Sequence, residues 1–291
     1  MSKLVITGIT GQLGGLVVRH LLDMGVSPDQ IRGVARDPQK AAGLSEQGIE
    51  IVPGDYDQPA SLLTAFADAS KLLFISAPSY DNTLRVRQHA GVVEAARNAR
   101  VGQIIYTSIA FPQKMKLGLE NVHLATEYMI KTTNLPYTFL RNAFYLEILV
   151  NESLRGVVAS GELVTSAPNG RMNYVTRNDL ARAAAIVLNG QGHENRTYEL
   201  VNPQPFNYDE FAALLSEVAA RAVKHRVVSP QEAIDLMVQA GAPETRAGFM
   251  VNGVYAAIEG GQFSGASDDL IQLLGRAYTP PQQAVRQALQ S

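Results

Sequence analysis

Residues 3–14 read Lys3-Leu4-Val5-Ile6-Thr7-Gly8-Ile9-Thr10-Gly11-Gln12-Leu13-Gly14, and this stretch decides the fold of the chain. A short apolar strand, predicted at residues 4–7, runs into three glycines at the spacing G-x-x-G-x-x-G. A helix is predicted directly after them, because apolar residues recur there at three- and four-residue steps. Glycines let backbone N–H groups approach a pyrophosphate, and the positive end of a helix favours its charge. Between a strand and a helix, these glycines predict a dinucleotide site rather than a plain turn.

The rest of the first half alternates short apolar strands with amphipathic helices. Further strands are predicted at residues 31–35, 49–53, 72–76, 103–107 and 137–141. Helices are predicted at residues 13–24, 38–47, 59–67, 83–98 and 120–133. This alternation predicts an α/β fold, a Rossmann-type doubly wound parallel sheet with helices on both faces. The ligand crevice of such a sheet lies beyond the carboxyl ends of its strands, so functional residues are expected there.

After residue 150 the pattern loosens. Strands are predicted at residues 162–165, 172–175, 197–201 and 224–228, and helices at residues 178–188, 208–220 and 230–240. No low-complexity linker separates the two halves. We expect an NADP-binding domain over residues 1–150 and a smaller α+β subdomain over residues 151–291 that mainly covers the substrate. The boundary is approximate, and some strands of the second half are expected to return to the first sheet.

Composition excludes several classes of function. The 291 residues carry a net charge of −2, which gives no electrostatic case for a nucleic-acid or membrane partner. The chain has no cysteine, which excludes disulfides, thiol catalysis and cysteine-bound metals. No apolar run approaches the ~20 residues of a membrane span. We expect no signal peptide, because the first strand is predicted at the start of the sequence. We expect a cytoplasmic protein with a small-molecule substrate; homodimer formation is left open.

The end of the second predicted strand bears on the choice of cofactor. An acidic side chain there would hold a ribose diol, whereas an arginine suits the 2′-phosphate of NADPH. Asp37 precedes Pro38, which is typical of a helix N-cap followed by proline at the first helical position. Arg36 is then left to face the crevice, which favours NADPH over NADH. After the third strand, Asp55 is a candidate partner of the adenine amino group, with a simple turn as the alternative.

The usual proton-transfer pair of reductases on this fold is absent. That pair is a tyrosine acid with a lysine four residues later on the same helix face. None of the eleven tyrosines is followed by such a lysine. The corresponding stretch instead places His123, Glu127 and Lys131 on one helix face, where His123 could donate a proton while Glu127 orients it. The alternative is a solvated face with ordinary charge pairs, and no metal is expected from so incomplete a ligand set.

Polar and small side chains follow several predicted strands at the expected crevice. The loop predicted after residue 141 carries Asn142, which can hydrogen-bond the substrate or the nicotinamide amide. Phe144 and Tyr145 can wall an apolar pocket, with a helix cap and core aromatics as the alternative. We therefore take Asn142, Tyr145 and His123 as candidate catalytic residues. The expected cofactor-binding residues are Thr7, Gly8, Thr10, Gly11, Gln12, Leu13, Gly14, Arg36, Asp55, Ser76, Ala77, Thr107 and Ser108.

Together these motifs resemble those of the NmrA-like atypical short-chain dehydrogenase/reductases, above all the bacterial triphenylmethane reductases and NAD(P)H:quinone oxidoreductases of that family. The resemblance spans nearly the whole chain and is carried by TGITGQLGG (7–15), VARDPQKA (34–41), GDYDQPASL (54–62), KLLFISAPSYDNT (71–83), HLATEYMIKTTNLPYTFLRNAFY (123–145), VTRNDLARAAA (175–185) and GHENRTYEL (192–200). It implies that NADPH is bound with its phosphates near Gly8, Gly11, Gln12, Gly14 and Arg36. Residues 109–119 diverge from the dye reductases and are expected to border the pocket.

The resemblance also implies the reduction of a flat conjugated electrophile such as a quinone or a triphenylmethane dye. These acceptors are already strongly electrophilic, so hydride transfer needs mainly a close and aligned nicotinamide. The missing tyrosine–lysine pair is then an expected feature. The alternative is an NmrA-like protein that senses NADP(H) without turnover and regulates a protein partner. A sugar-nucleotide epimerase is disfavoured because such enzymes usually require the absent pair.

Overall fold

Seven parallel strands form the central sheet in the computed structural model, which describes residues 2–290. Their order is β10-β6-β5-β4-β1-β2-β3, which confirms the predicted Rossmann-type doubly wound sheet. The order reverses between β1 and β4, and this is where the ligand crevice of such a sheet opens. The strands are β1 (Lys3–Thr7), β2 (Ile31–Ala35), β3 (Glu50–Pro53), β4 (Ala69–Phe74), β5 (Ile104–Ile109), β6 (Tyr137–Asn142) and β10 (Arg196–Leu200).

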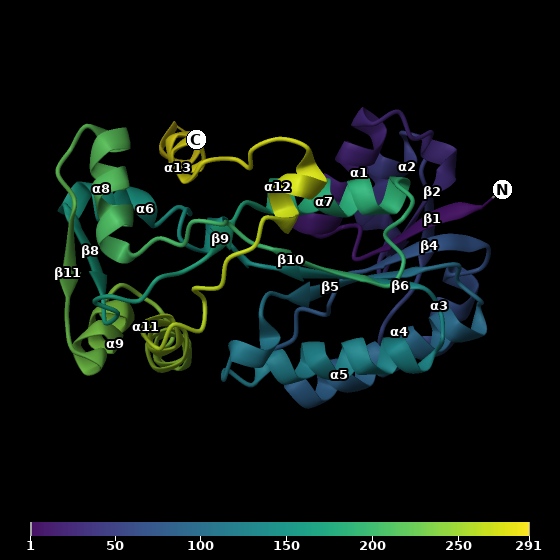
Figure 1. Cartoon of the computed structure of the whole chain (residues 1–291), viewed down its shortest axis with the longest axis horizontal. Helices are drawn as coiled ribbons and strands as arrows, with labels where there is room; N and C mark the ends of the chain where they lie inside the picture. The colour runs from purple at the N-terminus through teal and green to yellow at the C-terminus, as the bar shows by residue number, and fades with distance from the viewer. Residues whose placement is uncertain (1, 291) are drawn as a thin grey trace.

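Helices cover both faces of this sheet (Figure 1). On one face lie α1 (Gln12–Asp23), α2 (Ala42–Ser45), α7 (Arg177–Asn189) and α12 (Asp269–Leu274), and on the other lie α3 (Pro59–Ala65), α4 (Asn82–Asn98) and α5 (Leu119–Thr132). On α1, the apolar residues Val17 and Leu21 are fully buried in the core between this helix and the sheet. None of the helices within residues 2–290 is long and apolar enough to cross a membrane.

A second lobe lies beyond the carboxyl ends of the strands, at the left of Figure 1. It has its own apolar core, which includes Tyr208, Phe211 and Leu215. Its short parallel sheets pair β8 (Glu162–Thr165) with β11 (Lys224–Val227) and β7 (Phe144–Tyr145) with β9 (Tyr174–Val175). Its helices are α6 (Leu154–Ser160), α8 (Tyr208–Ala219), α9 (Pro230–Gln239), α10 (Glu244–Gly248), α11 (Ala256–Glu259) and α13 (Pro281–Gln290), with a π-helical segment at Phe249–Tyr255.

The chain passes between the lobes more than once. After the first stretch of the second lobe it returns to the larger lobe, where α7 packs on α1 and β10 pairs with β6 at the edge of the main sheet. The division at about residue 150 remains a proposal. Although α7, β10 and α12 follow residue 150 in the sequence, they lie in space with the nucleotide-binding half.

Two predicted boundaries near the crevice are wrong. The strand predicted at residues 72–76 is β4, which begins at Ala69 and ends at Phe74. Its start is extended because Ala69 pairs with Lys3 of β1, after which the register shifts. Ser76 thus lies beyond the strand. Asn142 was expected in a loop but is the last residue of β6, paired with Ile109 and Leu200 of the neighbouring strands. The short helices of the second lobe were missed because packing, not local pattern, stabilises helices of this length.

Candidate active site

The turn between β1 and α1 is shaped by its glycines. Gly8 has a φ of +61°, in the left-handed region that other residues rarely adopt. A methyl group on Gly14 would overlap the carbonyl oxygen of Gly8 and lie 2.9 Å from Cα of Ile9. Gly11 is the N-cap of α1 and has no side chain to cap it, so the first backbone N–H groups of the helix remain available to a ligand. This cradle fits a pyrophosphate.

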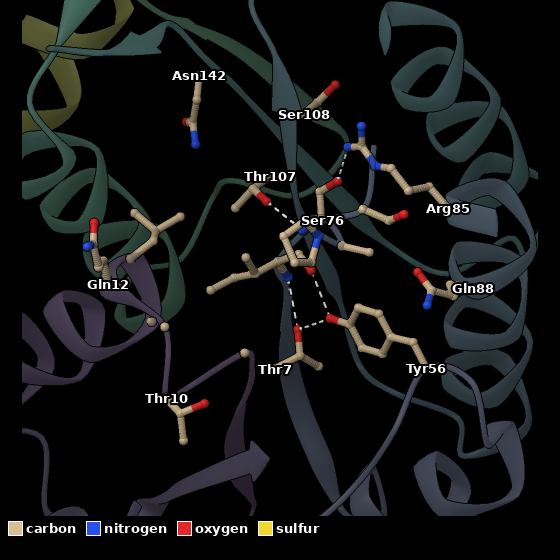
Figure 2. A pocket seen from close by; sticks show the side chains of 18 of the residues that line it. Thr7, Thr10, Gln12, Tyr56, Ser76, Arg85, Gln88, Thr107, Ser108 and Asn142 are labelled. Carbon is tan, nitrogen blue, oxygen red and sulfur yellow. Dashed lines mark hydrogen bonds between the residues drawn. The ribbon is translucent and has the colours of Figure 1, made fainter. Parts of the chain in front are cut away.

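The hydroxyl groups of Thr7 and Tyr56 form a hydrogen-bonded cluster next to this turn. Thr7 Oγ1 accepts a hydrogen bond from the backbone N–H of Ile75 at 2.9 Å and donates to the carbonyl of Leu73. The Tyr56 hydroxyl lies 2.6 Å from Thr7 Oγ1 and 2.8 Å from the Ile75 carbonyl oxygen (Figure 2). Burial raises the pKa of Tyr56, so its hydroxyl keeps its proton. These bonds tie β1 to the chain after β4 at the point where the strand order reverses.

The end of β2 carries the residues that bear on cofactor choice. The Asp37 carboxylate accepts from the backbone N–H of Gln39 at 3.1 Å, which confirms the expected helix cap. Arg36 is exposed and lines the cavity. Asp55 also lines the cavity, while its carboxylate accepts from the backbone N–H of Asp57 at 3.0 Å. The turn expected as the alternative for Asp55 is therefore present, and it leaves the residue at the cavity wall.

Ser76 and Ala77, which follow β4, are held in place by neighbours on β5 and α4. The backbone N–H of Ser76 donates to Thr107 Oγ1 at 3.0 Å, and that of Ala77 donates to His89 Nε2 at 3.0 Å. Because Nε2 accepts, the ring proton of His89 is on Nδ1, which lies 2.8 Å from Thr126 Oγ1. Burial and the nearby Arg85 lower the pKa of His89 to about 3, so its imidazole is neutral.

Neither alternative for His123 and Glu127 is correct, because the two side chains are buried and do not pair with each other. His123 Nδ1 lies 2.9 Å from the Tyr106 hydroxyl, and Nε2 lies 3.4 Å from a guanidinium nitrogen of Arg85. Glu127 instead accepts from Ser108 at 2.7 Å and from Arg141 at 2.9 and 2.7 Å. The spacing along the helix places both side chains on one face. Their hydrogen-bond partners, however, depend on which residues of the neighbouring strands lie opposite that face.

The electrostatics of His123 also argue against an acid role. Burial, and then the charge of Arg85, hold its pKa well below the ordinary value. The imidazole is therefore neutral at physiological pH and holds no readily donated proton. The Tyr106 hydroxyl beside it has a raised pKa, mainly through burial.

Asn142 and Tyr145 face the same cavity from the end of β6 and from β7. The Asn142 side chain is buried and its Oδ1 has no hydrogen-bond partner among residues 2–290, while its amide points into the cavity in Figure 2. The ring of Tyr145 stacks under Arg177, whose guanidinium carbon lies 4.5 Å from the ring centroid. Burial raises the pKa of Tyr145, although Arg177 offsets part of this effect. An orphaned buried amide oxygen in a cavity is the kind of group that a ligand satisfies.

All the candidate cofactor and catalytic residues line one cavity of about 870 Å³. The sequence reasoning missed several further lining residues, including Tyr56, Arg85, Gln88 and Arg177. One signal was available for Arg85. Arg85 and His89 lie on the same buried face of α4 as Val92 and Ala96. Two polar residues therefore occupy positions where an amphipathic helix usually has apolar ones. Ile109 and Leu119, at the two ends of the divergent stretch 109–119, do border the cavity.

A family model described as NAD(P)H-binding matches residues 8–191. The quinone oxidoreductase 2 of Escherichia coli is 33% identical over 95% of this chain and 95% of its own length. An NmrA-like family domain-containing oxidoreductase of Aspergillus flavus is 29% identical over 99% of this chain and 95% of its own. The chain belongs to the NAD(P)H-binding, NmrA-like oxidoreductase family.

Solved structures of family members superpose over the whole molecule. The triphenylmethane reductase of a Citrobacter species is 52% identical and matches with a TM-score of 0.96, covering all of both chains. The same reductase has been solved in complex with NADP(H). The E. coli quinone oxidoreductase 2 in complex with NADPH is 32% identical, with a TM-score of 0.91 over 98% of this chain and 99% of that chain. The similarity to members of the NmrA-like family therefore extends over both lobes.

Proposed function

We propose that this NmrA-like protein binds NADPH in the cavity and reduces a conjugated electrophile of the quinone or triphenylmethane-dye type. Bound NADPH would supply the hydride, and its nicotinamide C4 is the donor atom in such chemistry. The glycine turn of residues 8–14 would hold the pyrophosphate, and Arg36 the 2′-phosphate. Ser76, Ala77 and Thr107 would line the nicotinamide ribose. Full-length similarity to a dye reductase and a quinone reductase supports both acceptor classes.

The substrate is expected over the apolar wall that Phe144, Tyr145 and Ile148 form where the two lobes meet. In this proposal the second lobe serves as the substrate-covering subdomain. Asn142, with its free Oδ1, orients the nicotinamide amide or the acceptor, and Tyr145 fixes one side of the pocket. The role of these residues is positioning, which shortens and aligns the hydride path.

The single observation that carries the mechanism is that the histidine and tyrosine side chains described at the cavity are poor proton donors. His123 is neutral, and the phenols of Tyr56, Tyr106 and Tyr145 all have raised pKa values. A ketone or aldehyde substrate would need a proton donor in the transition state. A quinone does not, because water can protonate the hydroquinone anion afterwards, and a cationic dye becomes neutral on hydride transfer and takes up no proton. Proximity and alignment are then sufficient.

The test is the oxidation of NADPH with menadione and with a triphenylmethane dye, followed through the absorbance of the reduced nicotinamide. Turnover of at least one acceptor is expected. Tight NADPH binding without turnover over a broad acceptor panel would overturn the proposal in favour of a cofactor sensor.

Variants of the pocket wall test the assigned roles. Asn142→Ala should lower kcat about tenfold or more through lost alignment, with the dissociation constant of NADPH changed less. Tyr145→Phe keeps the ring under Arg177 and should change kcat less than threefold. Unchanged kinetics in Asn142→Ala would assign that residue to the structure of β6 alone.

A further inference from the structure

Arg85 stands out among the residues that line the cavity. Only 9% of its surface is exposed, yet the ion pairs formed among residues 2–290 include none with Arg85. Its guanidinium donates to Ser76 Oγ at 2.8 Å (Figure 2). A guanidinium nitrogen also approaches His123 Nε2 at 3.4 Å. Its Nε is buried with no hydrogen-bond partner among those residues. A buried cation that lacks an anion costs free energy unless something else supplies the negative charge.

Arg141, another largely buried arginine, is neutralised within the chain. Arg141, on β6, bonds Glu127 at 2.7 Å and Glu199 at 2.9 Å, so two carboxylates surround it. The hydrogen-bond partners of Arg85 are a hydroxyl and an imidazole, its other ionisable neighbours are His89 and Tyr106, and none of these groups is an anion. The chain therefore neutralises Arg141 internally and leaves the charge of Arg85 directed at the cavity.

We propose that the Arg85 guanidinium is a catalytic and specificity-determining group that stabilises an anionic oxygen on the acceptor. This inference rests on the proposed reductase function and selects between its two acceptor classes. A neutral quinone that accepts a hydride gains two electrons and one hydrogen nucleus, and becomes a hydroquinone monoanion. Its second proton comes from water, and NADPH is the reductant. The negative charge that develops on the quinone oxygen is the counter-charge that Arg85 lacks.

A cationic triphenylmethane dye places the opposite demand on the same group. It begins positive and becomes neutral when it accepts the hydride, so no anion forms. Its ground-state charge is repelled by the buried guanidinium, where the low local dielectric strengthens the interaction. Arg85 therefore favours quinone-type acceptors and disfavours cationic dyes, and removing its charge should move the two activities in opposite directions.

The kinetic test compares Arg85→Met with Arg85→Lys, using menadione and a cationic triphenylmethane dye. Arg85→Met should lower kcat/KM for menadione about 100-fold, as removal of one oxyanion donor does. It should raise the dye-to-menadione ratio of kcat/KM by more than 100-fold, while Arg85→Lys restores menadione reduction to within about tenfold. Arg87→Met is the matched control, because Arg87 lies on the same helix, is exposed and does not line the cavity. Loss of both activities in equal proportion would overturn the proposal.

The dissociation constant of NADPH separates this role from cofactor binding. Arg85→Met should leave it within about threefold of the wild type, and a loss as large as the loss in kcat/KM would assign Arg85 to the cofactor instead.

A binding measurement keeps the inference testable without turnover. 2-Hydroxy-1,4-naphthoquinone is an anion at neutral pH, and menadione is its neutral counterpart of similar shape. The NADP⁺-loaded wild-type protein should bind the anion at least tenfold more tightly than Arg85→Met does, with less than a threefold difference for menadione. Equal binding of the anion by both proteins overturns the role of Arg85. If the wild type turns over no acceptor but shows this preference for the anion, the proposed reductase function fails and the anion site stands.

Discussion

The two ends of the cavity are built in different ways. At the proposed cofactor end, the cradle is formed by one short run of chain, residues 7–14, through its backbone and missing side chains. The proposed substrate end is lined by side chains from separate elements, among them Arg85 on α4, His123 on α5 and Asn142 on β6. A contiguous cradle is visible as a motif, whereas a dispersed cluster becomes visible only when packing brings it together. The predictions below test whether the two ends are as separable in function as they are in construction.

The largest effect is expected at Gly14. In Gly14→Ala the new methyl group overlaps the Gly8 carbonyl oxygen and lies 2.9 Å from Ile9 Cα, so the turn must open. We expect at least a 100-fold loss of NADPH affinity, or a loss of about 3 kcal/mol in the free energy of unfolding. Calorimetric titration and urea unfolding measure these. Gly15→Ala is the matched control, because the nearest atom to its methyl group is 3.9 Å away, and it should be neutral or stabilising by up to ~1 kcal/mol. Equal NADPH affinity and equal stability in the two variants would show that the close approach at Gly14 is not needed for cofactor binding.

Arg36 sharpens the comparison within the cofactor end. Arg36→Ala should weaken NADPH binding by about 10- to 100-fold, since a charge-assisted contact to a phosphate is lost, and should leave NADH within about twofold. Lys40→Ala removes the same charge from an exposed position outside the cavity and should change neither dissociation constant appreciably. Equal losses for both cofactors would show that Arg36 does not read the 2′-phosphate.

The buried histidines of the substrate end should make stability depend on pH. Their folded pKa values lie below the unfolded value of 6.5, with His89 at about 3 and His123 well below 6.5. The unfolded chain therefore binds more protons between these values, so stability is complete above about pH 6.5 and falls as pH falls. We expect a loss of about 2 kcal/mol per histidine between pH 7 and pH 5, measured by urea unfolding.

His123→Phe is the control for that pH dependence, since it should remove about half of the slope while the carboxylates contribute as before. NMR titration of the rings gives a direct check. A pKa near 6.5 for either imidazole in the folded protein would refute the assignment of both as neutral groups.

How far the sequence predicts this molecule follows the same division. The Rossmann-type sheet, the glycine cradle and the Asp37 cap were all predicted, because each depends on residues close together in the chain. The pairing of His123 with Glu127 was predicted wrongly, because the true partners, Tyr106 and Arg141, come from strands of the sheet. Arg85 was missed for a similar reason: its direction toward the cavity depends on how α4 packs.

Tyr56 tests whether the cradle depends on residues outside its own stretch of chain, because it lies far from residues 7–14 in the sequence and hydrogen-bonds Thr7. Tyr56→Phe removes the hydroxyl that lies 2.6 Å from Thr7 Oγ1, and keeps the edge contact of its ring with Phe74. We expect a loss of about 1 kcal/mol in the free energy of unfolding, the typical value of one hydrogen bond. Tyr128→Phe is the control, since Tyr128 is 64% exposed and should change stability by less than ~0.5 kcal/mol.

The effect of Tyr56→Phe on NADPH binding decides the comparison. Thr7 keeps its bonds to Ile75 N–H and the Leu73 carbonyl in this variant, so β1 stays fastened to the chain after β4. The dissociation constant of NADPH should therefore rise no more than about threefold. A rise above tenfold would mean that the cradle depends on a distant side chain as strongly as the substrate end depends on Arg85. The glycine motif would then be the visible part of a dispersed site, and the contrast between the two ends would be one of visibility in the sequence and not of construction.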